Sequence, residues 1–363
     1  MRTGRIFAKD STFRTLFHFG EEHAKGRSCM LISSVILVIN NYLTTGIFYT
    51  GFLMGNDVDI VHIGVLSLLP FLANLFGVFS PLILERFQRR KRILTLSRAT
   101  YYTLHILGVT VVPYFAQSTT IKVVCFGVLI FAANVINALF IPGYQAWQVN
   151  FIPDKVRANY LSLSQILSNG VSSVVILFSS FAADALKGSP HEMTVMFALR
   201  YVAYVIAIAD VIVLALPKEY PYAKAARVKL KNIVVLPLRH KKFLLTMLIV
   251  FTWTYFQYLT VSPLDYYLLN NVGVQYTFIN LINASYALFL IFFSRYWKGV
   301  LGKYSWFTTF ALSGILHGPT NLLYAFISST NYLWLMPTVR LTQHFLGVGL
   351  NLTFANMVFV NLP

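Results

Sequence analysis

Residues 81–92 read PLILERFQRRKR and place one acid and five basic side chains within eight positions. The apolar run 61–84 leads into this cluster, and another apolar run follows from residue 93. An apolar stretch of about 20 residues is long enough to cross the hydrocarbon core of a bilayer as a helix. The charge cluster is therefore predicted to form a short solvent-exposed turn between two membrane spans.

The composition of the 363-residue chain extends this interpretation. The chain is 57% hydrophobic and 11% charged, whereas a typical soluble domain carries about 25% charged residues. The net charge of +17 does not indicate a nucleic-acid partner, because the basic residues lie in the gaps between apolar runs and not on one basic face. Cys29 and Cys125 have no nearby partner, so they predict neither a disulfide nor a metal site.

Ten apolar runs are predicted to be membrane-spanning helices. They cover residues 30–54, 61–84, 94–115, 121–142, 158–183, 194–216, 243–262, 276–296, 305–327 and 332–357. With a cytoplasmic N-terminus, the inside segments hold 25 of the 29 Lys and Arg residues. Cytoplasmic loops are enriched in these residues, so we expect a multi-pass protein of the cell membrane with its N-terminus inside.

The basic loop 217–242 divides the spans into two sets. The predicted organisation is a cytoplasmic segment 1–29, a six-helix lobe 30–216, a cytoplasmic linker 217–242 and a four-helix lobe 243–363. Similar inside turns follow spans 2 and 8, and similar proline-containing segments follow spans 4 and 10, which suggests a duplicated half. By that analogy 12 spans are expected, and the second lobe is predicted to be incomplete.

The turn at 81–92 resembles the cytoplasmic motif of the major facilitator superfamily, Gly-x-x-x-Asp-Arg/Lys-x-Gly-x-Arg/Lys-Arg/Lys. Glu85 stands at the acidic position, Arg86 at the first basic position, and Arg90 and Lys91 at the last two, while Pro and Gln replace the glycines. The resemblance implies an all-α, two-lobed bundle that transports solutes by alternating access. It also implies that Glu85 and Arg86 help to hold one conformation by pairing across the lobe interface.

The same resemblance implies a midplane cavity lined by spans 1, 4, 7 and 10. Span 10 carries Arg340, His344, Gly347 and Asn351 on one helical face. An intramembrane arginine should face protein, water or an anion, so Arg340 is the candidate contact for an anionic solute. The alternative is an arginine that snorkels to the interface or forms a structural ion pair. His344 is a candidate proton or substrate contact, or else a core histidine.

The other three spans carry further polar candidates for solute binding. These are Asn40 and Asn41 in span 1, Asn134 and Asn137 in span 4, and Trp253 and Gln257 in span 7. Uncharged amides serve equally well as links between packed helices. Asp210 in span 6 is a second candidate coupling residue beside His344, or a structural partner of a neighbouring span.

The leading hypothesis is a monomeric secondary transporter that moves a small polar or anionic solute across a lipid bilayer, with protons or another ion as coupling partner. The sequence contains no Walker-type glycine loop, no metal-spaced Cys/His cluster and no recognisable catalytic triad. We therefore expect no cofactor, no metal and no enzymatic activity. Two alternatives stay open: a membrane remnant or sensor that does not transport, and a polytopic membrane enzyme.

Overall fold

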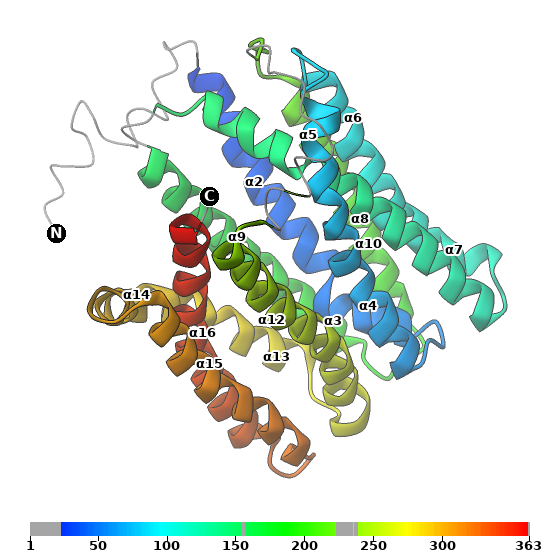
Figure 1. The fold of residues 1–363 in the computed structure, drawn as a ribbon. Helices are drawn as coiled ribbons and strands as arrows, with labels where there is room; N and C mark the ends of the chain where they lie inside the picture. Colours follow the sequence, from blue (N-terminus) through cyan, green and yellow to red (C-terminus); the bar gives the residue numbers. More distant parts are fainter. Residues whose placement is uncertain (1–22, 154–156, 223–234, 236–238, 362–363) are drawn as a thin grey trace, which may run out of the picture. The chain divides into compact units, whose positions relative to one another are not determined.

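The computed structural model describes residues 23–153, 157–222, 235 and 239–361. The chain forms two compact units (Figure 1). The first unit is Met1–Ile176 with Pro190–Ile233, and the second is Leu177–Ser189 with Val234–Pro363. The second unit thus includes the end of predicted span 5, and the lobe boundaries at 216 and 243 stay a prediction. The N-terminal segment 1–22 and most of the linker lie outside the described residues.

Each of the ten predicted spans coincides with a helix or a run of helices. The first unit contains α2 (Ala24–Thr44), α3 (Gly46–Met54), α4 (Ile60–Asn74), η2 (Leu75–Phe79), α5 (Ser80–Leu84), α6 (Lys91–Tyr102), η3 (Thr103–Gly108), α7 (Val109–Phe115), α8 (Thr119–Asn150) and α10 (Glu192–Ala215). Helix α9 (Arg157–Ala185) contributes residues to both units. The second unit continues with α12 (Lys241–Tyr266), η5 (Tyr267–Val272), α13 (Tyr276–Ala284), α14 (Tyr286–Lys303), α15 (Trp306–Leu322), η6 (Leu323–Phe326) and α16 (Tyr332–Asn361).

Seven helical segments among the described residues are long and apolar enough to cross a membrane, judged by length and composition. They are Ala24–Met54, Ile60–Leu84, Thr119–Asn150, Leu163–Ala185, Glu192–Ala215, Lys241–Val272 and Tyr276–Lys303. The segments of predicted spans 3, 9 and 10 are helical as well. All the regular structure of the described chain is therefore α, 3-10 or π helix, as the hydrophobic pattern predicts.

In the first unit, α8 packs against α4 and α6, and α10 packs against α2 and α6 (Figure 1). Gly143 allows the close approach of α8 to α5 and α6. A Cβ at this position would lie 2.7 Å from Leu94 Cδ2 and 3.0 Å from Leu84 Cδ1. These contacts are shorter than normal carbon–carbon contacts, so the two leucine side chains would have to move to admit a larger residue.

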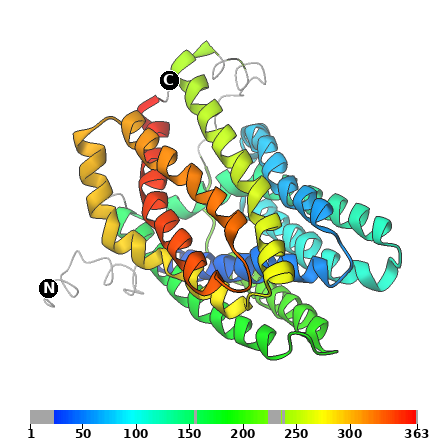
Figure 2. The same ribbon diagram turned by 90° about the horizontal axis from the view of Figure 1, so that it is seen from below.

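In the second unit, α16 packs against both α14 and α15 (Figures 1 and 2). Trp297 of α14 is 2% exposed, and its indole Nε1 donates a 2.8 Å hydrogen bond to the carbonyl of Phe345. The backbone of Gly349 lies directly against this indole ring, where a Cβ would come within 2.7 Å. These contacts fix α16 on α14 and so determine which of its faces turns to α12 and α15.

Two of the predicted spans are interrupted helices. Span 1 breaks between α2 and α3, where Gly46 has a φ of +60°, a value that favours glycine. Span 8 breaks at Ser285, between α13 and α14. In transporter folds, discontinuous helices commonly form the solute site. The first break follows Asn40 and Asn41, and the second lies beside His344, as described below.

Candidate solute cavity

The second unit contains a partly open cavity of about 450 Å³. Its walls come from α12, α14, α15, η6 and α16. The lining residues are Trp253, Gln257, Thr260, Val261, Leu264, Tyr286, His317, Asn321, Tyr324, Arg340, Gln343, His344, Gly347, Leu350 and Asn351. The structure therefore brings five of the predicted binding residues, from spans 7 and 10, around one space. The four residues of the predicted stripe on span 10 all line it.

Arg340 is half-buried and has no carboxylate within ion-pair distance in the described part of the chain. Its guanidinium carbon lies 5.2 Å from the centre of the Tyr324 ring, and one terminal nitrogen lies 3.4 Å from Gln343 Oε1. Its Nε is buried and has no hydrogen-bond partner among the described residues. Because Arg340 lines the cavity, the terminal nitrogens of its guanidinium can donate hydrogen bonds to a solute there. The structural ion pair considered from the sequence stays an alternative.

Gln343 organises the polar wall around Arg340. Its Oε1 accepts a 3.2 Å hydrogen bond from the Tyr324 hydroxyl. Its Nε2 donates to Asn321 Oδ1 at 2.8 Å and to Thr320 Oγ1 at 3.1 Å. Sequence reasoning missed Gln343 because it lies off the stripe that Arg340 begins. The spacing of three residues from Arg340 is the signal that could have found it.

His344 lies where α16 meets the break in span 8. Its Nδ1 is 3.2 Å from Ser285 Oγ, and its ring packs edge-on against Tyr286 and Phe289 at centroid distances of 5.3 and 5.8 Å. The side-chain amide of Asn351 donates a hydrogen bond to the Tyr286 hydroxyl. The polar stripe of α16 is thus held against the start of α14 at two points.

Two further groups belong to this site although the sequence did not point to them. His317 lines the cavity, and its ring lies 5.5 Å from the ring of Trp253. Asp265 lies next to the lining residue Leu264, is 4% exposed and is within electrostatic range of Arg340. A buried acid near a cavity cation is a functional candidate by the general rule for intramembrane charges.

The candidates of spans 1 and 4 belong to the first unit and do not line this cavity. Asn40 is 1% exposed, and neither polar atom of its side chain has a hydrogen-bond partner among the described residues. Asn41 is exposed, and Asn137 is half-buried. Asn134 donates a 2.8 Å hydrogen bond to the carbonyl of Ile130 in its own helix. A solute role for these four residues stays a prediction.

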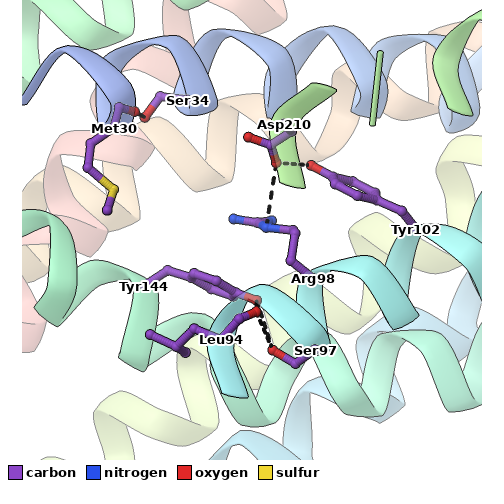
Figure 3. Close-up of polar contacts among 8 residues, drawn as sticks. All are labelled: Met30, Ser34, Leu94, Ser97, Arg98, Tyr102, Tyr144 and Asp210. Atoms are coloured by element: carbon purple, nitrogen blue, oxygen red, sulfur yellow. Dashed lines mark hydrogen bonds and ion pairs between the residues drawn. The ribbon is translucent and has the colours of Figure 1, made fainter. Parts of the chain in front are cut away.

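Asp210 belongs to a buried polar cluster of the first unit (Figure 3). Its Oδ2 accepts a 2.6 Å hydrogen bond from the Tyr102 hydroxyl and lies 3.8 Å from Arg98 Nε. The Arg98 guanidinium in turn lies 4.1 Å from the centre of the Tyr144 ring, and the Tyr144 hydroxyl donates to the carbonyl of Leu94 at 2.6 Å. Asp210 therefore has partners on a neighbouring span, Tyr102 and Arg98 of span 3. A structural partner of this kind is the alternative role that the sequence analysis considered for Asp210.

Two residues of the basic turn at 81–92 contact the segment that follows α10. Lys91 donates through Nζ to the carbonyl of Pro217 and through its backbone N–H to Glu219 Oε1, both at 2.7 Å. Arg90 lies 4.1 Å from the centre of the Tyr222 ring. Burial raises the pKa of the Tyr222 phenol, although Arg90 acts in the opposite direction. The start of the linker is thus bound to the turn within the first unit.

The first two residues of the family-like motif behave differently from the last two. Arg86 is exposed, and Glu85 is half-buried with its Oε2 lacking a hydrogen-bond partner among the described residues. The predicted pairing of Glu85 and Arg86 across the lobe interface stays a prediction. Arg90 and Lys91, by contrast, contact the segment that follows α10.

Comparisons with known proteins identify the fold. No protein-family profile and no curated protein sequence matches this chain. A crystal structure of a mutant of the nucleoside transporter NupG is similar with a TM-score of 0.68 and 12% identity, over 93% of this chain and 83% of that chain. A crystal structure of a D-xylose-proton symporter is similar with a TM-score of 0.58 and 12% identity, over 94% of this chain and 88% of that chain.

Both similar structures are transporters with the fold of the major facilitator superfamily. The chain is therefore a polytopic, all-helical membrane protein with that type of fold, which confirms the predicted fold class. At 12% identity, the similarity to these structures shows the fold and not the substrate. The predicted incompleteness of the second lobe stays a prediction.

Proposed function

We propose that this protein is a secondary active transporter that moves a small polar or anionic solute by alternating access. The observation that carries the proposal is the convergence of Arg340, His344 and Asn351 of α16 with Trp253 and Gln257 of α12 on one cavity of about 450 Å³. Cavities of roughly 300–1,000 Å³ with a few convergent polar groups are typical of small-molecule sites. The similar structures, a nucleoside transporter and a D-xylose-proton symporter, are of proteins named for small polar solutes.

Arg340 gives the site its preference for negative charge. Arg340 lines the cavity, and no carboxylate of the described chain lies within ion-pair distance of its guanidinium. Hydrogen bonds between a guanidinium and an ionised acceptor are stronger than those between neutral groups, and low-dielectric surroundings increase the difference. A carboxylate or similar anion is the solute group that satisfies Arg340 best.

Proton coupling is the finer part of this proposal. His344 lines the cavity and Asp265 lies beside it, so both groups can respond to the charge of a bound solute. Asp210 was the other coupling candidate. Its hydrogen bond from Tyr102 and its proximity to Arg98 favour a structural role. We therefore assign coupling first to Asp265 and His344.

The topology belongs to the proposal as well. We place the protein in the cell membrane as a monomer with its N-terminus in the cytoplasm, because 25 of the 29 basic residues then lie in inside segments. The experiment for this point is labelling of single cysteines in intact cells. A cysteine replacing Arg89 in the basic turn should be protected from a membrane-impermeant reagent, and one replacing Ser189 should react.

Transport in proteoliposomes tests the function. A panel of organic anions and matched neutral analogues is offered with and without a pH gradient. Arg340→Ala should raise the KM for the transported anion at least about tenfold, the cost of losing one charge-assisted hydrogen bond. Arg295→Ala is the matched control, because Arg295 is an exposed cation on α14 that does not line the cavity.

Three outcomes decide the proposal. An Arg340→Ala protein that transports the anion with unchanged affinity contradicts the assigned role of Arg340. If a pH gradient drives accumulation of the solute, and the Asp265→Asn protein exchanges the solute without accumulating it, the coupling assignment is supported. Absence of transport for every solute, in a protein that binds one of them, supports the non-transporting sensor instead.

A further inference from the structure

A second hollow adjoins the polar cavity in the same unit. It has a volume of about 570 Å³ and lies between α12 and α15. Leu248, Ile249 and Phe256 of α12 and Phe310 of α15 supply apolar walls. We call this space the α12–α15 groove. Its chemistry differs from that of the cavity, whose walls carry Arg340, two histidines and several amides.

The two hollows share part of their walls. Trp253, Gln257, Thr260 and Asn321 line both the polar cavity and the α12–α15 groove. The indole of Trp253 faces His317 of the cavity and Phe310 of the groove, at ring-centroid distances of 5.5 and 6.0 Å. The polar and the apolar space are therefore neighbours that meet at these four residues.

The floor of the groove is open along the backbone of α15. A Cβ added at Gly318 would meet no heavy atom within 4 Å, whereas one at Gly314, a turn earlier, would touch Trp253 at 3.7 Å. An extended, narrow occupant can lie against the helix at Gly318. A methylene chain is an occupant of that shape.

We propose, on the basis of the proposed function, that the solute is an amphiphilic anion with a single alkyl chain. Its anionic group lies at Arg340 in the polar cavity, and its chain extends past Trp253 into the α12–α15 groove. Two observations carry this assignment: Arg340 lines the polar cavity without a carboxylate of the described chain at ion-pair distance, and a shared wall joins this cationic space to an apolar one. A wholly apolar occupant of the groove, such as a helix, would leave the donor capacity of Arg340 unused.

Equilibrium binding of radiolabelled butanoate, octanoate and dodecanoate to the protein in nanodiscs tests the proposal. Uptake by empty nanodiscs of the same lipid is subtracted, because alkyl chains also partition into lipid. Burial of one methylene group is worth a gain of about fourfold in affinity. The Kd should therefore fall about fourfold per added methylene until the groove is filled. Arg340→Gln should weaken binding of all three acids by a similar factor.

Gly318→Phe is the decisive variant, because its ring fills the groove and leaves the polar cavity unchanged. Binding of butanoate should stay as in the unaltered protein, while the affinity for dodecanoate should fall at least tenfold. Gly299→Phe is the matched control: Gly299 lies on α14, lines neither hollow, and a Cβ there also meets open space. This variant should bind all three acids normally.

The possible failures are distinguishable. Butanoate binding that depends on Arg340, with no gain in affinity for longer chains, overturns the amphiphile and leaves the proposed transport of a small anion standing. Equal losses for dodecanoate in Gly318→Phe and Gly299→Phe also overturn it. A dimer in nanodiscs that Gly318→Phe abolishes would assign the groove to a second copy of the chain, which again excludes the alkyl chain. Absence of binding for every acid overturns the amphiphile, while the transport panel decides separately whether another polar or anionic solute is moved.

Discussion

The phenol of Tyr102 donates a 2.6 Å hydrogen bond to Oδ2 of Asp210, although the two residues lie 108 positions apart in the sequence. Nε of Arg98 lies 3.8 Å from the same carboxylate oxygen (Figure 3). The exposed fractions of the Arg98 and Asp210 side chains are 6% and 0%. Loss of one member of a buried charge pair leaves the other uncompensated. This cluster therefore makes a direct prediction about stability.

Removal of either charge alone should destabilise the first unit more than removal of both. We expect Asp210→Leu and Arg98→Met each to cost about 3–5 kcal/mol, and the double variant to cost less than either. Thermal unfolding in detergent measures the three variants and the unaltered protein as a double-mutant cycle. Additive losses in the double variant would show that the two side chains act independently, against the contacts seen here.

Gln343 should determine how well Arg340 binds anions. Gln343→Leu removes the hydrogen bonds to Tyr324 and Asn321, so we expect the affinity for an anionic solute to fall about tenfold. Gln343→Glu places a carboxylate where Oε1 now lies, 3.4 Å from Arg340, and should compete with the anion directly. Binding isotherms for an anion and its neutral analogue distinguish the two effects. A Gln343→Glu protein that binds the anion normally would contradict the assignment.

Asp184 should stabilise the start of α13. Its two carboxylate oxygens accept hydrogen bonds from the backbone N–H groups of Tyr276 and Thr277, each at 2.7 Å. Loss of such a capping residue costs about 1 kcal/mol. Asp184→Ala should accordingly speed hydrogen exchange of the α13 N-terminal peptide about fivefold in mass spectrometry. Lys187→Ala removes contacts of the same segment that do not involve these N–H groups, to the carbonyl of Val274 and to the ring of Tyr276, and should change this exchange rate less than Asp184→Ala does.

The start of α4 should loosen in acid. Asp59 accepts hydrogen bonds from the backbone N–H of His62 and of Val61, and its Oδ2 lies 2.6 Å from His62 Nδ1. The backbone hydrogen bond from His62, followed by the side-chain contact, lowers the pKa of Asp59 below its ordinary value of 3.8. A carboxyl with a lowered pKa stabilises the folded state fully above its ordinary pKa, and the stabilisation is lost as the pH falls through the folded value.

Hydrogen exchange of the first turn of α4, corrected for the intrinsic effect of pH, measures this loss. Protection should decrease as the pH falls below the ordinary carboxyl pKa of about 4. Asp59→Asn is the control, because an amide also accepts hydrogen bonds from backbone N–H groups but does not titrate in this range. Identical pH profiles for the two proteins would show that Asp59 is not the responsible group.

The comparison of sequence and structure separates two kinds of information about the site. Helical periodicity alone placed Arg340, His344 and Asn351 on one face of α16, because residues three and four apart in a helix are neighbours whatever surrounds them. The same rule does not say which helix that face meets. The contacts of His344 with Ser285, and of Asn351 with Tyr286, depend on how α16 is rotated against α14.

The sequence by itself determined the ten helical spans and where charge separates them, because about 20 apolar residues are needed to cross a bilayer and charged residues are costly within it. The tertiary structure alone decided the partners: Tyr102 and Arg98 for Asp210, and Gln343 for Arg340. The physical reason is that a membrane span is apolar on most of its faces. Its hydrophobic pattern therefore does not identify the face that packs, and the contacts between helices make that choice.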